Sequence, residues 1–222
     1  MATLTRNFGF NDNAGVYDLD SGRWVGVVGG GTNVTFSGTT QADSPNDPGG
    51  PPPYTTDGCW QANRFGKNLS NGTPYYEWTG TYQDLGVPAG STISAVNLSY
   101  DWECQSYAIG AASSFGPAEL RDSSGTSILA TFSAAITTIT AVTTWATSTG
   151  TTASGRSDAA ATTIKLRIGV NPKTGNSNSA SVTLILDWVV VTVTYTAGGP
   201  ATSDPLALYT ERHNPRRRVT YR

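Results

Sequence analysis

Four carboxylates in the middle of the chain are the residues best suited to catalysis. They are Glu77, Asp84, Asp101 and Glu103. Two carboxyl groups at a suitable separation are enough to hydrolyse a glycosidic bond. Asp101 and Glu103 lie two positions apart, so in a strand they share one face while Trp102 takes the other. We expect these carboxylates to face solvent beside a buried tryptophan, and the sequence therefore disfavours an enzyme.

Other catalytic or cofactor chemistry has little support in the sequence. The single histidine, His213, lies near the C-terminus, where nothing indicates the packing that a general base or a zinc ligand needs. Gly29-Gly30-Gly31 lacks the spacing of a dinucleotide-binding loop. Residues 18–22, DLDSG, resemble the start of a calcium loop but lack its distal glutamate, so a hairpin turn is favoured. We expect no cofactor and no metal.

The cysteines and tryptophans allow alternatives. Cys59 and Cys104 have no metal-binding or redox spacing, so two reduced, partly buried thiols are favoured over a disulfide between loops. The six tryptophans could form a sugar-stacking platform or fill a core. We expect Trp78, Trp102 and Trp188 in the core, and Trp60 exposed.

Composition predicts an all-β protein. Charged residues make up 14% of the 222 positions, and short runs rich in β-branched and aromatic residues alternate with turns that contain Gly or Pro. The N-terminus lacks the apolar segment of a secretory signal, and Asp187 interrupts the longest apolar run. We therefore expect synthesis in a cytoplasm and no membrane span.

The strand pattern predicts a jelly-roll-like antiparallel β-sandwich over residues 1–197, with almost no helix. Residues 162–172 place Lys165 and Arg167 outward between apolar inward positions, and 181–196 form a long strand. Residues 41–58 contain Pro51-Pro52-Pro53 and form an exposed loop. Residues 198–222 form an extended basic arm.

Two stretches carry a resemblance to a known class of protein. YYEWTGTYQDLGVPAGSTISAVNLSYDW and VTLILDWVVVTVTYT resemble segments of β-sandwich structural proteins from tailed bacteriophages. The second is also similar to the last strand of galactose-binding-like jelly rolls. The resemblance implies a virion component, either a capsid decoration (cement) protein or a tail, neck or fibre component.

The arm is the basic part of the chain. Five arginines against Glu211 give +4 for residues 210–222, which leaves −6 for the rest of a chain whose net charge is −2. Arginine pairs with carboxylates through a planar fork, so we expect the arm to bind an acidic protein partner. The predicted contact residues are Arg212, Arg216, Arg217, Arg218, Tyr221 and Arg222. Nucleic acid is disfavoured as a partner because the rest of the chain is acidic.

The function predicted first is non-catalytic capsid decoration in a bacteriophage virion, as a homotrimer bound to the major capsid protein or other virion proteins. The alternatives are a tail, neck or fibre component, or a carbohydrate-binding module that serves host attachment. Exposed aromatic residues with polar neighbours would favour carbohydrate. A flat face rich in Thr and Ser, together with an ordered arm, would favour the shell.

Overall fold

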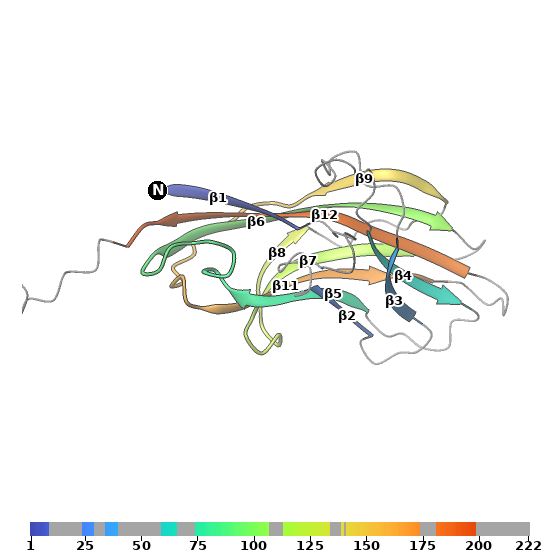
Figure 1. Cartoon of the computed structure of the whole chain (residues 1–222), viewed down its shortest axis with the longest axis horizontal. Helices are drawn as coiled ribbons and strands as arrows, with labels where there is room; N and C mark the ends of the chain where they lie inside the picture. The colour runs from blue at the N-terminus through green and yellow to red at the C-terminus, as the bar shows by residue number, and fades with distance from the viewer. Residues whose placement is uncertain are drawn as a thin grey trace, which may run out of the picture.

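The computed structural model shows strands throughout the part of the chain that it describes. That part comprises residues 1–8, 24–28, 34–39, 59–65, 74–106, 113–133, 139, 141–173 and 181–198. These ranges contain twelve strands and no helix, arranged in two antiparallel sheets (Figure 1). The predicted all-β sandwich is confirmed. No helix in the described ranges is long and apolar enough to span a membrane.

The larger sheet has seven strands and is built around β12. Its members are β10 (Ala153–Ser154), β6 (Thr92–Ser106), β12 (Ser181–Thr196), β4 (Cys59–Phe65), β3 (Val34–Thr39), β1 (Ala2–Phe8) and β9 (Thr143–Thr149). One edge of β12 pairs with β6; along the other, β4 pairs with residues 181–186 and β1 with residues 189–195. The strand predicted from residues 181–196 is confirmed.

The smaller sheet has five strands in the order β2-β5-β11-β7-β8. Its members are β2 (Trp24–Val27), β5 (Tyr75–Thr81), β11 (Thr163–Asn171), β7 (Ser114–Asp122) and β8 (Ile128–Ser133). A tight turn that includes Gly125, at a φ of 75°, joins β7 to β8. Because glycine adopts positive φ without steric cost, this turn follows from the local sequence.

The core lies between the two sheets and follows from strict alternation along the strands. In the smaller sheet Trp78, Leu166 and Leu120 form one cross-strand row, and each is fully buried. Burying a leucine side chain stabilises a fold by roughly 1.5–3 kcal/mol relative to leaving it exposed. Lys165 and Arg167 alternate with these positions, so the outer face of this sheet is polar.

Trp188 does not lie in the core, contrary to expectation. The register of β12 against β6 shifts between Asp187 and Val190, and Trp188 adopts a positive φ of 43° there. A β-bulge of this kind adds residues to one strand and turns a side chain away from its alternating position. The indole is therefore half-buried at the bulge. Trp78 is in the core as expected, and Trp102 packs on its edge against Phe115 at 5.4 Å between ring centroids.

Several predicted features lie outside the described residues. They are the proline loop at 41–58, the turn at 18–22, the side chains of Cys59 and Trp60, and the arm beyond Gly198. The expectations for these segments stay predictions.

Candidate ligand-binding cleft

Strand register gathers charged side chains on the outer face of the five-stranded sheet. Glu77 of β5 lies opposite Arg167 of β11, which lies opposite Glu119 of β7. Lys165 and Arg121 form the next row, two residues along the strands. Residues directly opposite on one face have Cβ atoms about 4.5–5.5 Å apart, so these side chains interact across strands.

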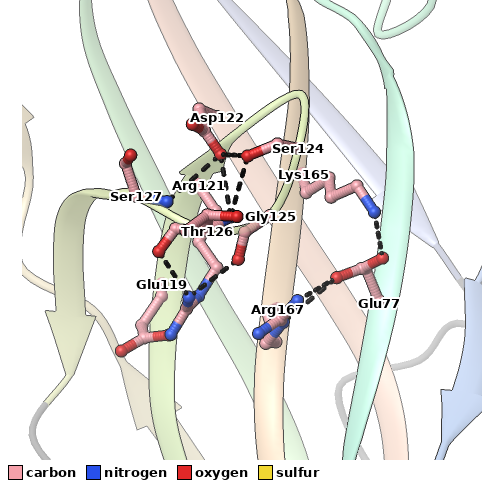
Figure 2. Close-up of polar contacts among 10 residues, drawn as sticks. All are labelled: Glu77, Glu119, Arg121, Asp122, Ser124, Gly125, Thr126, Ser127, Lys165 and Arg167. Atoms are coloured by element: carbon pink, nitrogen blue, oxygen red, sulfur yellow. Dashed lines mark hydrogen bonds and ion pairs between the residues drawn. The ribbon is translucent and has the colours of Figure 1, made fainter.

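Glu77 binds two cations at once. Lys165 Nζ donates to Oε1 at 2.7 Å, and Arg167 Nε donates to Oε2 at 3.1 Å (Figure 2). Burial opposes ionisation of this carboxyl, but the hydrogen bonds from Lys165 and Arg167 outweigh it and hold the pKa of Glu77 below its usual value. Glu77 is therefore a carboxylate at neutral pH.

Glu119 and Arg121 form a second pair on the same face. Arg121 donates to Glu119 Oε2 through both Nε and Nη2 at 2.7 Å, while its Nη1 donates to the carbonyl oxygen of Gly125 at 2.9 Å. The turn that carries Gly125 is fixed by Asp122, whose Oδ1 accepts from the Ser124 hydroxyl at 2.8 Å and from the Thr126 amide at 3.0 Å (Figure 2). These hydrogen bonds, that of Ser124 foremost, lower the pKa of Asp122. The turn thus holds one end of the Arg121 guanidinium.

A β-bulge beside these charges shapes a cleft. The register of β11 against β7 shifts between Ile168 and Val170, so that Gly116 and Pro117 lie opposite the single residue Gly169. A Cβ atom at Gly169 would lie 2.4 Å from the carbonyl oxygen of Gly116, so only glycine permits this approach of the two backbones. Proline is tolerated in an interior strand at such a bulge because the ladder is already interrupted.

The cleft encloses about 360 Å³ at this end of the sheet. The side chains that define it are Tyr75, Pro117, Glu119, Arg121, Arg167 and Asn171. Arg167 Cζ lies 3.7 Å from the centroid of the Tyr75 ring, so the guanidinium stacks on that ring while it binds Glu77. The cleft therefore combines two rigid rings with ordered charged donors and acceptors.

This arrangement suits a neutral ligand with several hydroxyl groups. Each hydroxyl can donate to a carboxylate oxygen of Glu119 and accept from an arginine N–H of Arg121 or Arg167. The apolar faces of Tyr75 and Pro117 offer packing for C–H groups. The charged side chains are held by their mutual pairing, with exposures of 15–16% for the two arginines and 8% for Glu119, so little ordering remains for a ligand to induce.

The four predicted carboxylates do not come together. Glu77 lies at the edge of the charged face described above. Asp84 closes a turn after β5, where its Oδ2 accepts from the Thr81 amide at 2.7 Å and from the Thr81 hydroxyl at 2.9 Å. Asp101 and Glu103 lie on β6 in the other sheet.

The expectation that Asp101 and Glu103 face solvent is wrong. Their side chains point away from the core, since Trp102 and Cys104 take the alternate positions, yet the two residues are only 2% and 9% exposed. Burial raises the pKa of Glu103. Alternation assigned the correct face, but it carries no information on what covers that face. Asp101, Thr147 and Trp188 border a hollow of about 470 Å³ at the bulge of β12.

Cys104 is a free, buried thiol, as the favoured interpretation predicted for it. Burial, with the neighbouring Glu103 carboxylate, raises its pKa to about 11, so thiolate chemistry is suppressed at neutral pH. In the described ranges no group of three or more His, Cys, Asp or Glu side chains could hold a metal ion.

Sequence reasoning missed most of the cleft. It placed Lys165 and Arg167 outward, but it did not single out Tyr75, Pro117, Glu119, Arg121 or Asn171. The alternation of Glu119 and Arg121 around Leu120 in PAELRD was the available signal. The predicted partner-binding residues of the arm, Arg212 to Arg222, lie outside the described ranges and stay predictions.

No family model matches the sequence, and no curated protein matches it either. Solved structures do resemble the fold. An arabinose-bound GH51 α-L-arabinofuranosidase superposes with a TM-score of 0.50 at 12% identity, over 86% of this chain and 26% of that one. The chain thus corresponds to about a quarter of that enzyme. At this identity the likeness shows the β-sandwich fold alone.

Weaker similarities include carbohydrate-binding modules and one phage protein. A family 11 carbohydrate-binding module of a cellulosomal cellulase from Clostridium thermocellum matches with a TM-score of 0.40 at 13% identity, over 84% of this chain and 94% of the module. The enzymatically active domain of tailspike protein 4 of bacteriophage CBA120 matches with a TM-score of 0.38 at 13% identity, over 75% and 19% of the two chains. These values are too low to transfer a function.

Proposed function

We propose that this chain is a non-catalytic glycan-binding β-sandwich protein, which binds an oligosaccharide in the cleft on the outer face of its five-stranded sheet. The observation that carries the proposal is the cleft itself, in which Tyr75, Arg121, Arg167 and Glu119 surround about 360 Å³. The sequence predicts carbohydrate binding only as an alternative, but the cleft makes it the function proposed first.

A glycan fits the cleft better than an apolar ligand does. Small-molecule sites in general are lined predominantly by hydrophobic side chains, with few polar groups. Here arginine–carboxylate pairs occupy one side of the cleft and a tyrosine stacked with arginine occupies another. A pyranose or furanose ring presents both the hydroxyls and the C–H faces that such a lining can bind.

The electrostatics of Glu77 and Glu119 favour binding over hydrolysis. A glycosidase acid needs a carboxyl group whose pKa is raised, so that it carries a proton at neutral pH. Glu77 has a lowered pKa because Lys165 and Arg167 stabilise its charge. Glu119 is paired with Arg121 through two N–H groups. We therefore expect Glu77 to stay ionised rather than to act as a proton donor, and Glu119, which lines the cleft, to accept a hydrogen bond from a ligand hydroxyl.

Binding to a panel of immobilised oligosaccharides, followed by calorimetry with the best soluble glycan, tests the proposal. Tyr75→Ala and Arg167→Met should each weaken binding by about five- to 150-fold, because removing one well-placed contact costs about 1–3 kcal/mol. Thr149→Ala, an exposed change on β9 of the other sheet, is the matched control and should leave affinity unchanged.

Thermal unfolding of each variant separates lost contacts from lost structure. The proposal is wrong if a folded protein binds no glycan on the panel, or if both cleft variants bind as well as the original chain.

A virion location for the same protein is a second proposal. The seven-stranded sheet presents an uncharged row of polar side chains, Thr5, Thr192 and Asn97, on its outer face. Such a surface, with the arginine-rich arm at 210–222, is what the sequence predicts for attachment to other virion proteins. Capsid decoration as a trimer and a tail or fibre position are the two forms of this proposal, and glycan binding for host attachment is compatible with the second.

A further inference from the structure

Two arginines, Arg121 and Arg167, line the cleft, and arginine commonly binds anionic groups. Both side chains are nevertheless already paired with carboxylates of the protein. Arg167 donates from Nε and Nη2 to Glu77, and Arg121 donates from Nε and Nη2 to Glu119 (Figure 2). Lys165, the third cation of this face, bonds the same Glu77 and does not line the cleft. Each guanidinium therefore uses one edge of its planar fork within the protein.

Arg167 and Glu119 face each other across the cleft without bonding to each other. They lie directly opposite on β11 and β7, where Cβ atoms are about 4.5–5.5 Å apart. The structure describes both residues and shows no ion pair between them, because Arg167 turns to Glu77 on β5 and Glu119 turns along β7 to Arg121. The cleft thus has a donor on one side and an acceptor on the other.

One polar atom of each group is left for a ligand. Both bonding nitrogens of Arg121 contact the same oxygen, Oε2, and no contact among the described residues engages Oε1 of Glu119. Likewise, Nη1 of Arg167 has no acceptor among the residues that the structure describes. Neither atom is one of the buried polar atoms that lack a partner, so solvent reaches both.

The other end of the cleft carries neutral polar groups. Ser114 and Asn171 lie opposite each other on β7 and β11, and both line the cleft. Asn171 is four residues beyond Arg167, so the two polar ends lie roughly 13 Å apart along the strand. Between them lies Gly169, which has no side chain, with Tyr75 opposite it on β5. The cleft therefore offers hydroxyl-binding groups at both ends and room for a ring between them.

We infer that the cleft selects neutral glycans with unsubstituted hydroxyls and discriminates against acidic and O-acylated ones. A hydroxyl is a neutral group that can both donate to Glu119 Oε1 and accept from Arg167 Nη1. A ligand carboxylate or sulfate would approach the Glu119 carboxylate, and Arg167 already shares its charge with Glu77, so the cost of desolvating the ligand's charge would not be offset. This inference rests on the proposed function and adds the class of ligand.

An acyl ester is disfavoured for a different reason. It has no O–H group, so it cannot donate to Glu119 Oε1 and leaves that oxygen without a partner once the ligand excludes water.

The test compares matched ligands on the full chain by calorimetry and amide NMR. Cellotetraose, mannotetraose and arabinotetraose are the neutral probes. Each is also used in an O-acetylated form, and the two hexose chains are used with their primary hydroxyls oxidised to carboxylates. Any other neutral glycan of the panel that binds more tightly is modified in the same ways. The best neutral ligand should bind about five- to 150-fold more tightly than its modified forms.

The comparison is repeated at high salt to separate contact from long-range repulsion. The body of the chain is acidic and repels any anion at a distance, but added salt screens that effect. Contact with Glu119 is screened much less, so the preference for the neutral form should persist.

A charge-removing variant and a matched control test the role of Glu119. Glu119→Gln keeps the shape of the side chain and one acceptor oxygen. It should weaken binding of the best neutral ligand and strengthen binding of the oxidised form, whereas a merely structural role would weaken both. Asp158→Asn is the control, because Arg156 bonds Asp158 through Nε and Nη2 in the same way and neither residue lines the cleft. It should leave the ratio of the two affinities unchanged.

If Glu119→Gln does not fold, the ligand series on the unmodified chain decides the matter. Acidic or acetylated forms that shift Tyr75 and Gly169 and bind as tightly as the neutral form overturn the inference and leave the proposed function in place. No shift in the cleft with any glycan overturns the proposed function, and the inference with it.

Discussion

Glu77 shows how one residue can order the charged outer face of a sheet. Its carboxylate accepts from both Lys165 and Arg167 while only 8% of its side chain is exposed. Replacing it by glutamine removes the negative charge and one of the two acceptor oxygens that Lys165 and Arg167 use. We expect Glu77→Gln to lower the free energy of unfolding by about 1–3 kcal/mol at pH 7, a typical cost when a charged group loses its hydrogen-bond partner. Urea unfolding measures this difference.

The pH dependence of the free energy of unfolding provides a second test of the role of Glu77. Its pKa in the folded state is lowered, so its stabilising contribution is fully present above the pKa of the unfolded chain and is lost as pH falls through the folded pKa. The difference in free energy of unfolding between the original chain and Glu77→Gln should therefore be smaller at acid pH than at neutral pH. Thr163→Ala, an exposed change on the same face of β11, should have the same free energy of unfolding as the original chain at both pH values. A gap that is constant from neutral to acid pH would contradict this role for Glu77.

Single residues also show where sequence reasoning stops. Alternation placed Lys165 and Arg167 outward and Trp78 inward, because the period of a strand is two and one face must be buried. The same pattern put Asp101 and Glu103 on the outer face, which is correct, and in solvent, which is not. Burial of an outward residue depends on distant parts of the chain, and no local pattern records them.

At the scale of elements, the bulge between β7 and β11 leads to a testable prediction. Gly169 lets the Gly116–Pro117 bulge approach β11, and a Cβ atom there would lie 2.4 Å from the Gly116 carbonyl oxygen. We expect Gly169→Ala to destabilise the fold by about 1–3 kcal/mol, as overpacking does, and to weaken glycan binding because Pro117 and Tyr75 move relative to each other. Denaturant unfolding and calorimetry check the two effects.

Thr131→Ala on β8 is the control, because Thr131 is exposed and lies opposite Glu119. It should change neither stability nor glycan affinity appreciably. Gly169→Ala with unchanged stability and affinity would show that the bulge does not shape the cleft.

At the scale of elements, most strands were predictable and the cleft was not. The turn at Gly90, the hairpin between β7 and β8 and the alternation of β11 follow from local chemistry, and the structure has them all. Within the described ranges, the Thr-rich strand β9 pairs with β6 alone. The order β2-β5-β11-β7-β8 depends on pairings between distant strands. Since this order aligns Glu77, Arg167 and Glu119, the cleft could not be assembled from the sequence.

At the scale of the whole molecule, we expect the C-terminal arm to be dispensable for folding. Strand β12 ends at Thr196, and the core residues of that strand end at Val193. Deleting residues 200–222 should therefore leave the thermal midpoint unchanged. If the virion proposal holds, the deletion should weaken co-sedimentation with assembled particles, and more so at low salt, because exposed charge pairs are screened as salt rises.

A full-length chain with lysine in place of Arg216, Arg217 and Arg218 should keep only part of the binding if the contacts use the planar arginine fork. Full particle occupancy without the arm, at low and at high salt, would refute a role in attachment.

The central claim is that the outer face of the five-stranded sheet binds a glycan, and an amide NMR titration of the full chain with the best-binding oligosaccharide tests it most directly. The largest shifts should fall on Tyr75, Gly116, Arg121, Arg167 and Gly169, which line one cleft on three strands. Residues of the opposite sheet, such as Thr5 and Thr192, should not move. Shifts confined to the seven-stranded sheet, or no saturable shift with any glycan, would contradict the account.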